Sequence, residues 1–176
     1  MELNFAGKKL IVIGGTSGIG KAVASLVLSN GGSALLVGRR EAKTREAVQE
    51  LGSCGEVSGW SVDITSSAGR ATLIDHLHAK HADATLLVNA AGVFAPKPFL
   101  DHTEPDYDRY LEINRALFFI TQCVAKNMVA GKRGGSIVNI GSMWARQAVQ
   151  ATPSSAYSMA KAGPTRIGAK DCANSN

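Results

Sequence analysis

The sequence of 176 residues lacks several features that would each have pointed to a particular class of protein. No stretch approaches eighteen consecutive apolar residues, so a membrane-spanning helix is not expected. The three cysteines, Cys54, Cys123 and Cys172, have no paired spacing of the kind that metal or redox sites use, which favours a reduced, cytoplasmic setting. Internal repeats, low-complexity tracts and linkers are also missing, so one domain with one core is expected.

Long runs of one charge are absent as well. The formal net charge is +5, but the basic residues are spread along the chain without a run of five or six. Local phosphate contacts are therefore a better interpretation than a nucleic-acid partner. Near the N-terminus, two lysines precede a short apolar run, which is too short to cross a membrane and is predicted to be a buried strand rather than a signal peptide.

What the chain does have is an alternation of strand and helix patterns. Apolar runs of strand length are separated by stretches with helical periodicity, which predicts parallel strands joined by right-handed crossovers. The fold class is thus α/β, a doubly wound parallel sheet of the Rossmann type. The predicted strands are residues 8–15, 33–38, 56–62, 85–89 and 134–142, and the predicted helices begin after residue 18, span 41–51, 66–80 and 105–130, and include residue 157.

The helical periodicity also predicts which side chains face the core. Pro105 suits the first turn of the longest helix. The expected inward faces are Ile19, Ala22, Val23, Leu26 and Val27 in the first helix, Leu73, Ile74 and Leu77 in the third, and Tyr110, Leu111, Asn114, Leu117 and Phe118 in the fourth.

A glycine cluster, "GGTSGIG" at residues 14–20, follows the first strand and opens the first helix. Gly15 and Gly18 allow a tight turn and close approach of a pyrophosphate, and Gly20 allows the helix to pack closely on the strand. The free N–H groups of the helix N-terminus favour phosphate. Glycine turns often serve geometry alone, but this placement favours dinucleotide binding by the turn, which also includes Thr16, Ser17 and Ile19.

The end of the second strand carries Gly38, Arg39 and Arg40, where a site for NAD would usually place an acidic residue. A guanidinium can bind the 2′-phosphate of NADP(H) through charged, forked hydrogen bonds, whereas an acid would repel it. NADP(H) is therefore the expected cofactor. The alternative is that the two arginines only solvate a loop.

Tyr157 and Lys161 are four residues apart in a predicted helix, so they share one face, and the ammonium can lie near the phenol and lower its pKa. A tyrosine with this spacing to a lysine also arises often by chance, so the pair means little by itself.

Together, these residues resemble the short-chain dehydrogenase/reductase family over residues 5–163. The "GGTSGIG" turn is similar to the family's glycine motif, with Gly14 where a threonine is usual. Asp63 resembles the acid that contacts adenine, and "NAAG", which contains Asn89, Ala90 and Gly92, resembles the motif of the fourth strand. The places of the family's four catalytic residues are taken by Asn114, Ser142, Tyr157 and Lys161.

The resemblance implies an NADP(H)-dependent oxidoreductase acting on a small carbonyl or secondary alcohol compound. Tyr157 would donate or remove the proton, Ser142 would hydrogen-bond the substrate oxygen, Lys161 would lower the tyrosine pKa and hold the nicotinamide ribose, and Asn114 would hold a water that relays protons. Each of the last three has a structural alternative, in which Ser142 caps a turn, Asn114 is a polar interruption and Lys161 is a solvated charge.

The sequence also departs from the family. The stretch between Ser142 and Tyr157 is longer than usual, which predicts an enlarged loop lined by Met143 and Trp144. After residue 163 the family's sixth and seventh strands have no counterpart, and Pro164 is expected to end or kink the helix just beyond Lys161. The expected domains are therefore residues 1–163, which bind the dinucleotide, and an atypical tail, 164–176.

Two functions remain open from the sequence. One is the oxidoreductase, and the other is a dinucleotide-binding protein that keeps the fold but lacks turnover. In either case the fifth strand is expected to be an uncovered apolar edge, which, with the long helix that often packs against a second subunit in the family, predicts a homo-oligomer.

Overall fold

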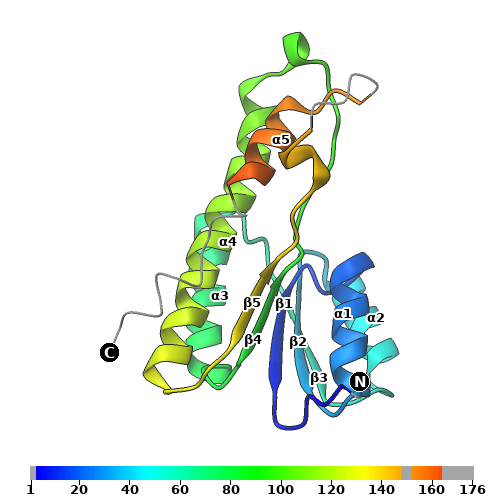
Figure 1. Ribbon diagram of the computed structural model, residues 1–176, viewed down its shortest axis with the longest axis vertical. Helices are drawn as coiled ribbons and strands as arrows, with labels where there is room; N and C mark the ends of the chain where they lie inside the picture. The colour runs from blue at the N-terminus through cyan, green and yellow to red at the C-terminus, as the bar shows by residue number, and fades with distance from the viewer. Residues whose placement is uncertain (1–2, 148–151, 164–176) are drawn as a thin grey trace.

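The computed structural model describes residues 3–147 and 152–163, in which strands and helices alternate (Figure 1). Apart from two short 3₁₀ helices, each of the five strands is followed by an α-helix. The elements are β1 (Lys9–Ile13), α1 (Gly18–Ser29), β2 (Ser33–Gly38), α2 (Glu41–Leu51), β3 (Val57–Ser61), α3 (Ser67–Lys80), β4 (Leu86–Asn89), η1 (Phe99–Asp101), α4 (Glu104–Ala130), β5 (Ser136–Asn139), η2 (Met143–Ala145) and α5 (Ser155–Ala162).

The five strands form one parallel sheet in the order β3-β2-β1-β4-β5. β1 lies in the middle, where Ile11 is opposite Leu35 of β2 and Leu87 of β4. Along the chain, β2 and β3 are added on one side of β1, and β4 and β5 are then added on the other side. This reversal creates a crevice at the carboxyl ends of β1 and β4, where ligands of such sheets bind. The doubly wound prediction is confirmed.

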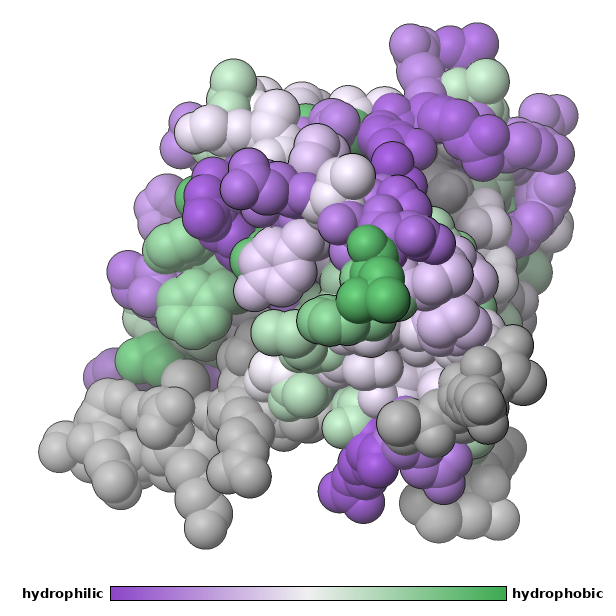
Figure 2. Space-filling model, turned by 90° about the horizontal axis from the view of Figure 1, so that it is seen from above, coloured by the Kyte–Doolittle hydropathy of each residue, from purple (hydrophilic) through white to green (hydrophobic). Residues whose placement is uncertain are grey.

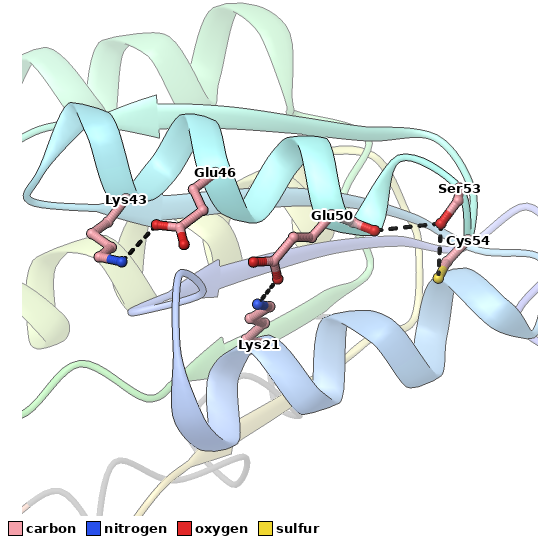
Figure 3. Close-up of polar contacts among 6 residues, drawn as sticks. All are labelled: Lys21, Lys43, Glu46, Glu50, Ser53 and Cys54. Carbon is pink, nitrogen blue, oxygen red and sulfur yellow. Dashed lines mark hydrogen bonds and ion pairs between the residues drawn. The ribbon is translucent and has the colours of Figure 1, made fainter.

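Helices cover both faces of the sheet, with α1 and α2 on one side and α3 and α4 on the other (Figure 1). Because successive side chains of a strand point to opposite faces, β1 contributes Ile11 and Ile13 to one core cluster and Leu10 and Val12 to the other. Figure 3 shows α1 and α2 joined at their surface by an ion pair between Lys21 and Glu50. The central strands are thus enclosed between two apolar layers.

The expected inward face of α1 was wrong for three residues. Ile19, Ala22 and Leu26 are exposed, and the buried residues are Gly20, Ala24, Val27 and Leu28. The small residues Gly20 and Ala24 turn toward the sheet because they let the helix approach it closely, and this rotates the larger side chains outward.

In the other helices the expected faces are mostly present. Leu73 and Leu77 of α3 are fully buried, as are Tyr110 and Leu117 of α4 to within a few per cent. Phe118 was predicted to face inward and is instead 48% exposed, because it follows Leu117 around the helix and leaves the buried stripe.

The ends of the last two helices agree with the sequence signals. α4 begins with a capping box between Thr103 and Asp106 and has Pro105 in its first turn. α5 ends at Ala162, just beyond Lys161 as predicted, and Ser154 occupies its N-cap position, where its side chain makes no capping hydrogen bond to the backbone. The predicted tail 164–176 and part of the enlarged loop, 148–151, lie outside the described residues. In the described ranges, every helix is too short or too polar to span a bilayer.

Candidate functional site

The glycine turn lies at the carboxyl end of β1 and is packed too tightly for larger residues. Gly14 has a φ of +86°, and a Cβ there would lie 2.6 Å from the backbone nitrogen of Ala91. A Cβ on Gly20 would lie 2.3 Å from the carbonyl oxygen of Gly14. By contrast, a Cβ on Gly18, whose φ is +53°, would meet no atom within 4 Å. The turn is therefore closely packed at Gly14 and Gly20 and open at Gly18.

In front of the turn lies a cleft of about 1060 Å³, at the upper end of the roughly 300–1,000 Å³ typical of ligand pockets. Most of the residues predicted to bind the cofactor line it. These are Thr16, Ser17, Gly18, Ile19, Gly20, Arg39, Arg40, Asp63, Ala90 and Gly92. Gly15 is buried beneath the turn, against Leu36 and Val12, and Asn89 lines a smaller neighbouring cavity.

The end of β2 presents two guanidinium groups to this cleft. Arg39 and Arg40 are both exposed, and Arg40 is the N-cap residue of α2. A Cβ on the preceding Gly38 would lie 2.5 Å from the Thr16 methyl group, so glycine is needed for the turn and the end of β2 to meet. This contact places both arginines beside the open end of the glycine turn.

Asp63 follows β3 on the same side of the cleft and is held in a fixed position. Its Oδ1 accepts hydrogen bonds from the Thr65 hydroxyl at 2.6 Å and the Thr65 backbone N–H at 2.9 Å. These bonds, with a smaller contribution from the Arg39 charge, lower the pKa of Asp63. The carboxylate is thus kept ionised as an acceptor at the cleft wall.

Three of the four predicted catalytic residues meet at the other end of the cleft. Lys161 donates from Nζ to the carbonyl oxygen of Ile140 at 2.8 Å, and Asn114 donates from Nδ2 to the carbonyl oxygen of Ala160 at 2.7 Å. Nζ of Lys161 also lies 5.9 Å from the ring centroid of Tyr157. Burial lowers the pKa of Lys161, which is only partly solvated.

Ser142, the fourth, lies between β5 and η2. Its Oγ accepts a hydrogen bond from the backbone N–H of Trp144 at 3.3 Å, so it does cap a turn. The hydroxyl proton stays free to donate, and the cap fixes the direction of the side chain.

A cavity of about 20 Å³ lies between these groups, which is enough for roughly one water. Asn114, Tyr157 and Lys161 line it, together with Asn89 and Asn139. Asn89 is 2% exposed and donates from Nδ2 to Thr121 and to Asn139, both at 2.8 Å. The cavity therefore has polar groups on several sides.

The first turns of α4 provide one wall of the cleft that was not predicted from the sequence. Its residues are Pro105, Asp108, Arg109, Glu112 and Ile113. Their spacing of three and four residues marks one helix face, so a second, polar stripe was present in the sequence. Among the described residues, no group of three or more His, Cys, Asp or Glu side chains is placed to hold a metal ion.

Comparison with known proteins gives a consistent result. Residues 8–170 match the family model for short chain dehydrogenases. The chain is 31% identical over 165 residues to the 3-oxoacyl-acyl-carrier-protein reductase FabG of Chlamydia pneumoniae and 32% identical over 150 residues to the L-xylulose reductase of Homo sapiens. These matches cover 93% and 85% of this chain, but only 65% and 59% of the two relatives.

Solved structures show the same relation. L-sorbose reductase from Gluconobacter frateurii, in complex with NADPH and L-sorbose, superposes with a TM-score of 0.84 at 25% identity, covering 92% of this chain and 62% of that one. A structure described as that of an NAD(P)-dependent gluconate 5-dehydrogenase from Beutenbergia cavernae, with NADP bound at low occupancy, also has a TM-score of 0.84, at 27% identity, covering 92% and 64%.

Proposed function

This chain belongs to the short-chain dehydrogenase family, and we propose that it is an NADP(H)-dependent oxidoreductase that interconverts a carbonyl compound and a secondary alcohol. The observation that carries the proposal is the convergence of Tyr157, Lys161 and Asn114 on one small polar cavity beside the large cleft. Residues of this kind, next to a glycine turn at a helix N-terminus, support hydride transfer coupled to proton transfer.

Each residue has a role that its contacts support. When bound, the nicotinamide supplies or accepts the hydride. The phenol of Tyr157 gives its proton to the substrate oxygen in reduction and takes it back in oxidation, while the Ser142 hydroxyl donates a hydrogen bond to the same oxygen. The Lys161 ammonium, held by Ile140, favours the phenolate electrostatically. Asn114 and the 20 Å³ cavity provide room for a water that returns the proton.

The choice of NADP(H) over NAD(H) rests on Arg39 and Arg40 at the cleft. We expect NADPH to bind at least about ten times more tightly than NADH, which corresponds to about 1.4 kcal/mol. Arg39→Ala or Arg40→Ala should narrow this difference, because each removes a cation from the 2′-phosphate side. Calorimetric titration with both cofactors measures it, and equal affinities in the unchanged protein would contradict the assignment.

The catalytic role is tested with Tyr157→Phe, which removes the proton donor and keeps the ring. We expect kcat to fall at least about a hundredfold, with cofactor affinity nearly unchanged. Tyr107→Phe is the matched control, because Tyr107 is a partly exposed tyrosine of α4 outside both cavities. Near-normal turnover in Tyr157→Phe would show that another group supplies the proton.

A second candidate function is cofactor binding without turnover. It is favoured by the lining of the large cleft, which includes the glycine turn, Arg39 and Asp63 but none of the four proposed catalytic residues. NADPH binding with no oxidation of NADPH across a panel of carbonyl compounds would support it. In either case we expect a cytoplasmic protein that forms homo-oligomers and acts on, or senses, small molecules.

A further inference from the structure

The ring of Tyr157, which lines the small cavity, is the first of three aromatic rings in a row. Phe94, in the segment after β4, lies with its ring centroid 4.9 Å from that of Tyr157, at an interplanar angle of 66°. Trp144 of η2 lies 6.4 Å from Phe94 with the two rings nearly parallel, at 8°. The ring of Tyr157, the proposed proton donor, is therefore adjoined by the ring of Phe94, which is in turn adjoined by the ring of Trp144.

These rings are still accessible. Phe94 is 47% exposed, although it packs against two other rings, and Trp144 and Tyr157 are each half-buried. The exposed side chains of Met143 and Met159 come from the same two helices that carry Trp144 and Tyr157. Figure 2, viewed onto the end of the molecule that carries α5, shows apolar and intermediate side chains in the middle of this face and hydrophilic ones mostly near its border.

The backbone that carries Phe94 is fixed at its neighbours. The Tyr110 hydroxyl donates to the carbonyl oxygen of Ala95 at 3.0 Å and accepts from the Ala95 N–H at 3.1 Å. Lys97 pairs with Asp106 at 2.5 Å and donates its backbone N–H to the carbonyl oxygen of Pro153 at 2.9 Å. The only ammonium on this segment is thus already engaged, and the ring is preorganised.

From this arrangement we propose that the Phe94–Trp144 pair determines specificity and selects a carbonyl substrate that carries an aromatic ring. The inference rests on the proposed function, because it names the substrate class of that same site. A planar ring attached to the carbonyl carbon can stack on Phe94 or Trp144 while the carbonyl oxygen meets Tyr157 and Ser142. A polyhydroxylated ketone would lose hydration at these surfaces and gain few hydrogen bonds in return.

The test measures binding of three ketones to the 176-residue chain by calorimetry, in saturating NADP⁺ so that no reduction occurs. The probes are acetophenone, its saturated analogue cyclohexyl methyl ketone, and L-sorbose. We expect acetophenone to bind more tightly than either, by up to about tenfold, since an aromatic contact is worth about 0.5–1.5 kcal/mol. Equal binding of acetophenone and its saturated analogue, or tighter binding of L-sorbose, overturns the proposal.

Variants identify the rings responsible. Phe94→Leu and Trp144→Leu should each remove most of the preference for acetophenone over cyclohexyl methyl ketone. Phe118→Leu is the matched control, because Phe118 is 48% exposed and also packs edge-to-face on another ring, but that ring is Phe119, whereas Phe94 packs on Tyr157 and Trp144. An unchanged preference in both Phe94→Leu and Trp144→Leu overturns the assignment.

The outcome for the aromatic site can be distinguished from the outcome for the proposed oxidoreductase function. Ring-dependent binding with no turnover of any ketone would support the aromatic site and contradict the oxidoreductase. Turnover that depends on Tyr157 but shows no preference for aromatic ketones would support the oxidoreductase and overturn the aromatic site. No detectable binding of any ketone would also overturn the aromatic site.

Discussion

The centre and the edges of the sheet contribute to the same cleft but are built differently. In β1, Leu10 to Ile13 are at most 1% exposed and pair with strands on both sides. β5 pairs in the described part of the chain with β4 alone, and its Val138 is 49% exposed. The glycine turn follows β1, whereas Ser142 follows β5 and α5 is tied to it through Ile140. The proposed nucleotide site therefore rests on the best-supported strand and the proposed catalytic residues on the least-supported one.

The largest loss of stability is expected in the closely packed glycine turn that follows β1. Gly20→Val places a branched side chain where even a Cβ would lie 2.3 Å from the carbonyl oxygen of Gly14. We expect the free energy of unfolding to fall by about 3 kcal/mol and cofactor binding to be lost, since overpacking in a rigid core is costly. Urea denaturation and NADPH titration measure both. Gly134→Val is the control, because a Cβ there meets nothing within 4 Å, and equal effects of the two changes would refute a crowded turn.

The next largest effect compares the local stability of α5, which carries Tyr157 and Lys161, with that of β1. Asn114→Leu removes the hydrogen bond to the carbonyl oxygen of Ala160 at 2.7 Å and leaves that acceptor unpaired, at a cost of about 1–2 kcal/mol. In native-state hydrogen exchange, the amides of α5 should already exchange in the unchanged chain through an opening of lower free energy than the global unfolding that exposes β1, and Asn114→Leu should lower that free energy further. If α5 and β1 exchange with the same free energy in the unchanged chain, the two regions unfold as one unit and the contrast between them is wrong.

At the edge of the sheet formed by β3, two histidines are expected to make the free energy of unfolding depend on pH. His76 stacks on Trp60 of β3 with centroids 3.7 Å apart, and its ring also lies 5.0 Å from that of His81. Burial lowers the pKa of both histidines, with a smaller contribution from Lys80 for His76. For His81, the charges of His76 and Lys9 lower the pKa further, while Asp83 opposes the shift.

A lowered histidine pKa means that the unfolded chain binds more protons than the folded one. Stability from these histidines is therefore complete above the ordinary value of 6.5 and is lost as the pH falls below it. We expect the urea midpoint to fall between pH 7 and pH 5, and His81→Gln to reduce that dependence. His102→Gln is the control, since His102 belongs to the other end of the molecule, where it contacts Pro98.

The smallest effect on stability, below about 0.5 kcal/mol, is expected for Val138→Lys, which places a charge on the exposed edge strand. We expect the unchanged chain to associate and this variant to shift toward monomer, because a lysine on an edge strand opposes pairing with another strand. Size-exclusion chromatography with light scattering compares the two. Monomers in both cases would contradict association through β5.

The sequence predicted the centre of the molecule better than its periphery, for a physical reason. Strand runs and the "GGTSGIG" turn depend on local geometry, so they could be located from neighbouring residues alone. The inward face of α1 depends on how closely the helix approaches the sheet, and the large Ile19 and Leu26 gave way to the small Gly20 and Ala24. Such choices are decided by tertiary packing, which periodicity does not record.

The candidate site shows the same division. Arg39, Asp63 and Lys161 follow strands or lie on a predicted helix, and each lies on a cavity wall, while their roles stay predictions. The wall formed by Asp108 and Arg109 and the ring of Phe94 were not anticipated. They come from segments whose position depends on contacts far along the chain, and no local pattern marks an exposed phenylalanine as part of a site.

The strand order also governs how the chain acquires its structure. Residue 10 of β1 pairs with residue 34 on one side and with residue 86 on the other. The pairing with β2 can form as soon as the first fifty residues leave the ribosome, but the other side of β1 then waits for β4 as an unpaired strand. Non-local parallel pairing of this kind folds slowly and exposes apolar strand edges meanwhile. During synthesis, the most deeply buried strand of the described sheet thus keeps an exposed apolar edge until β4 has been made.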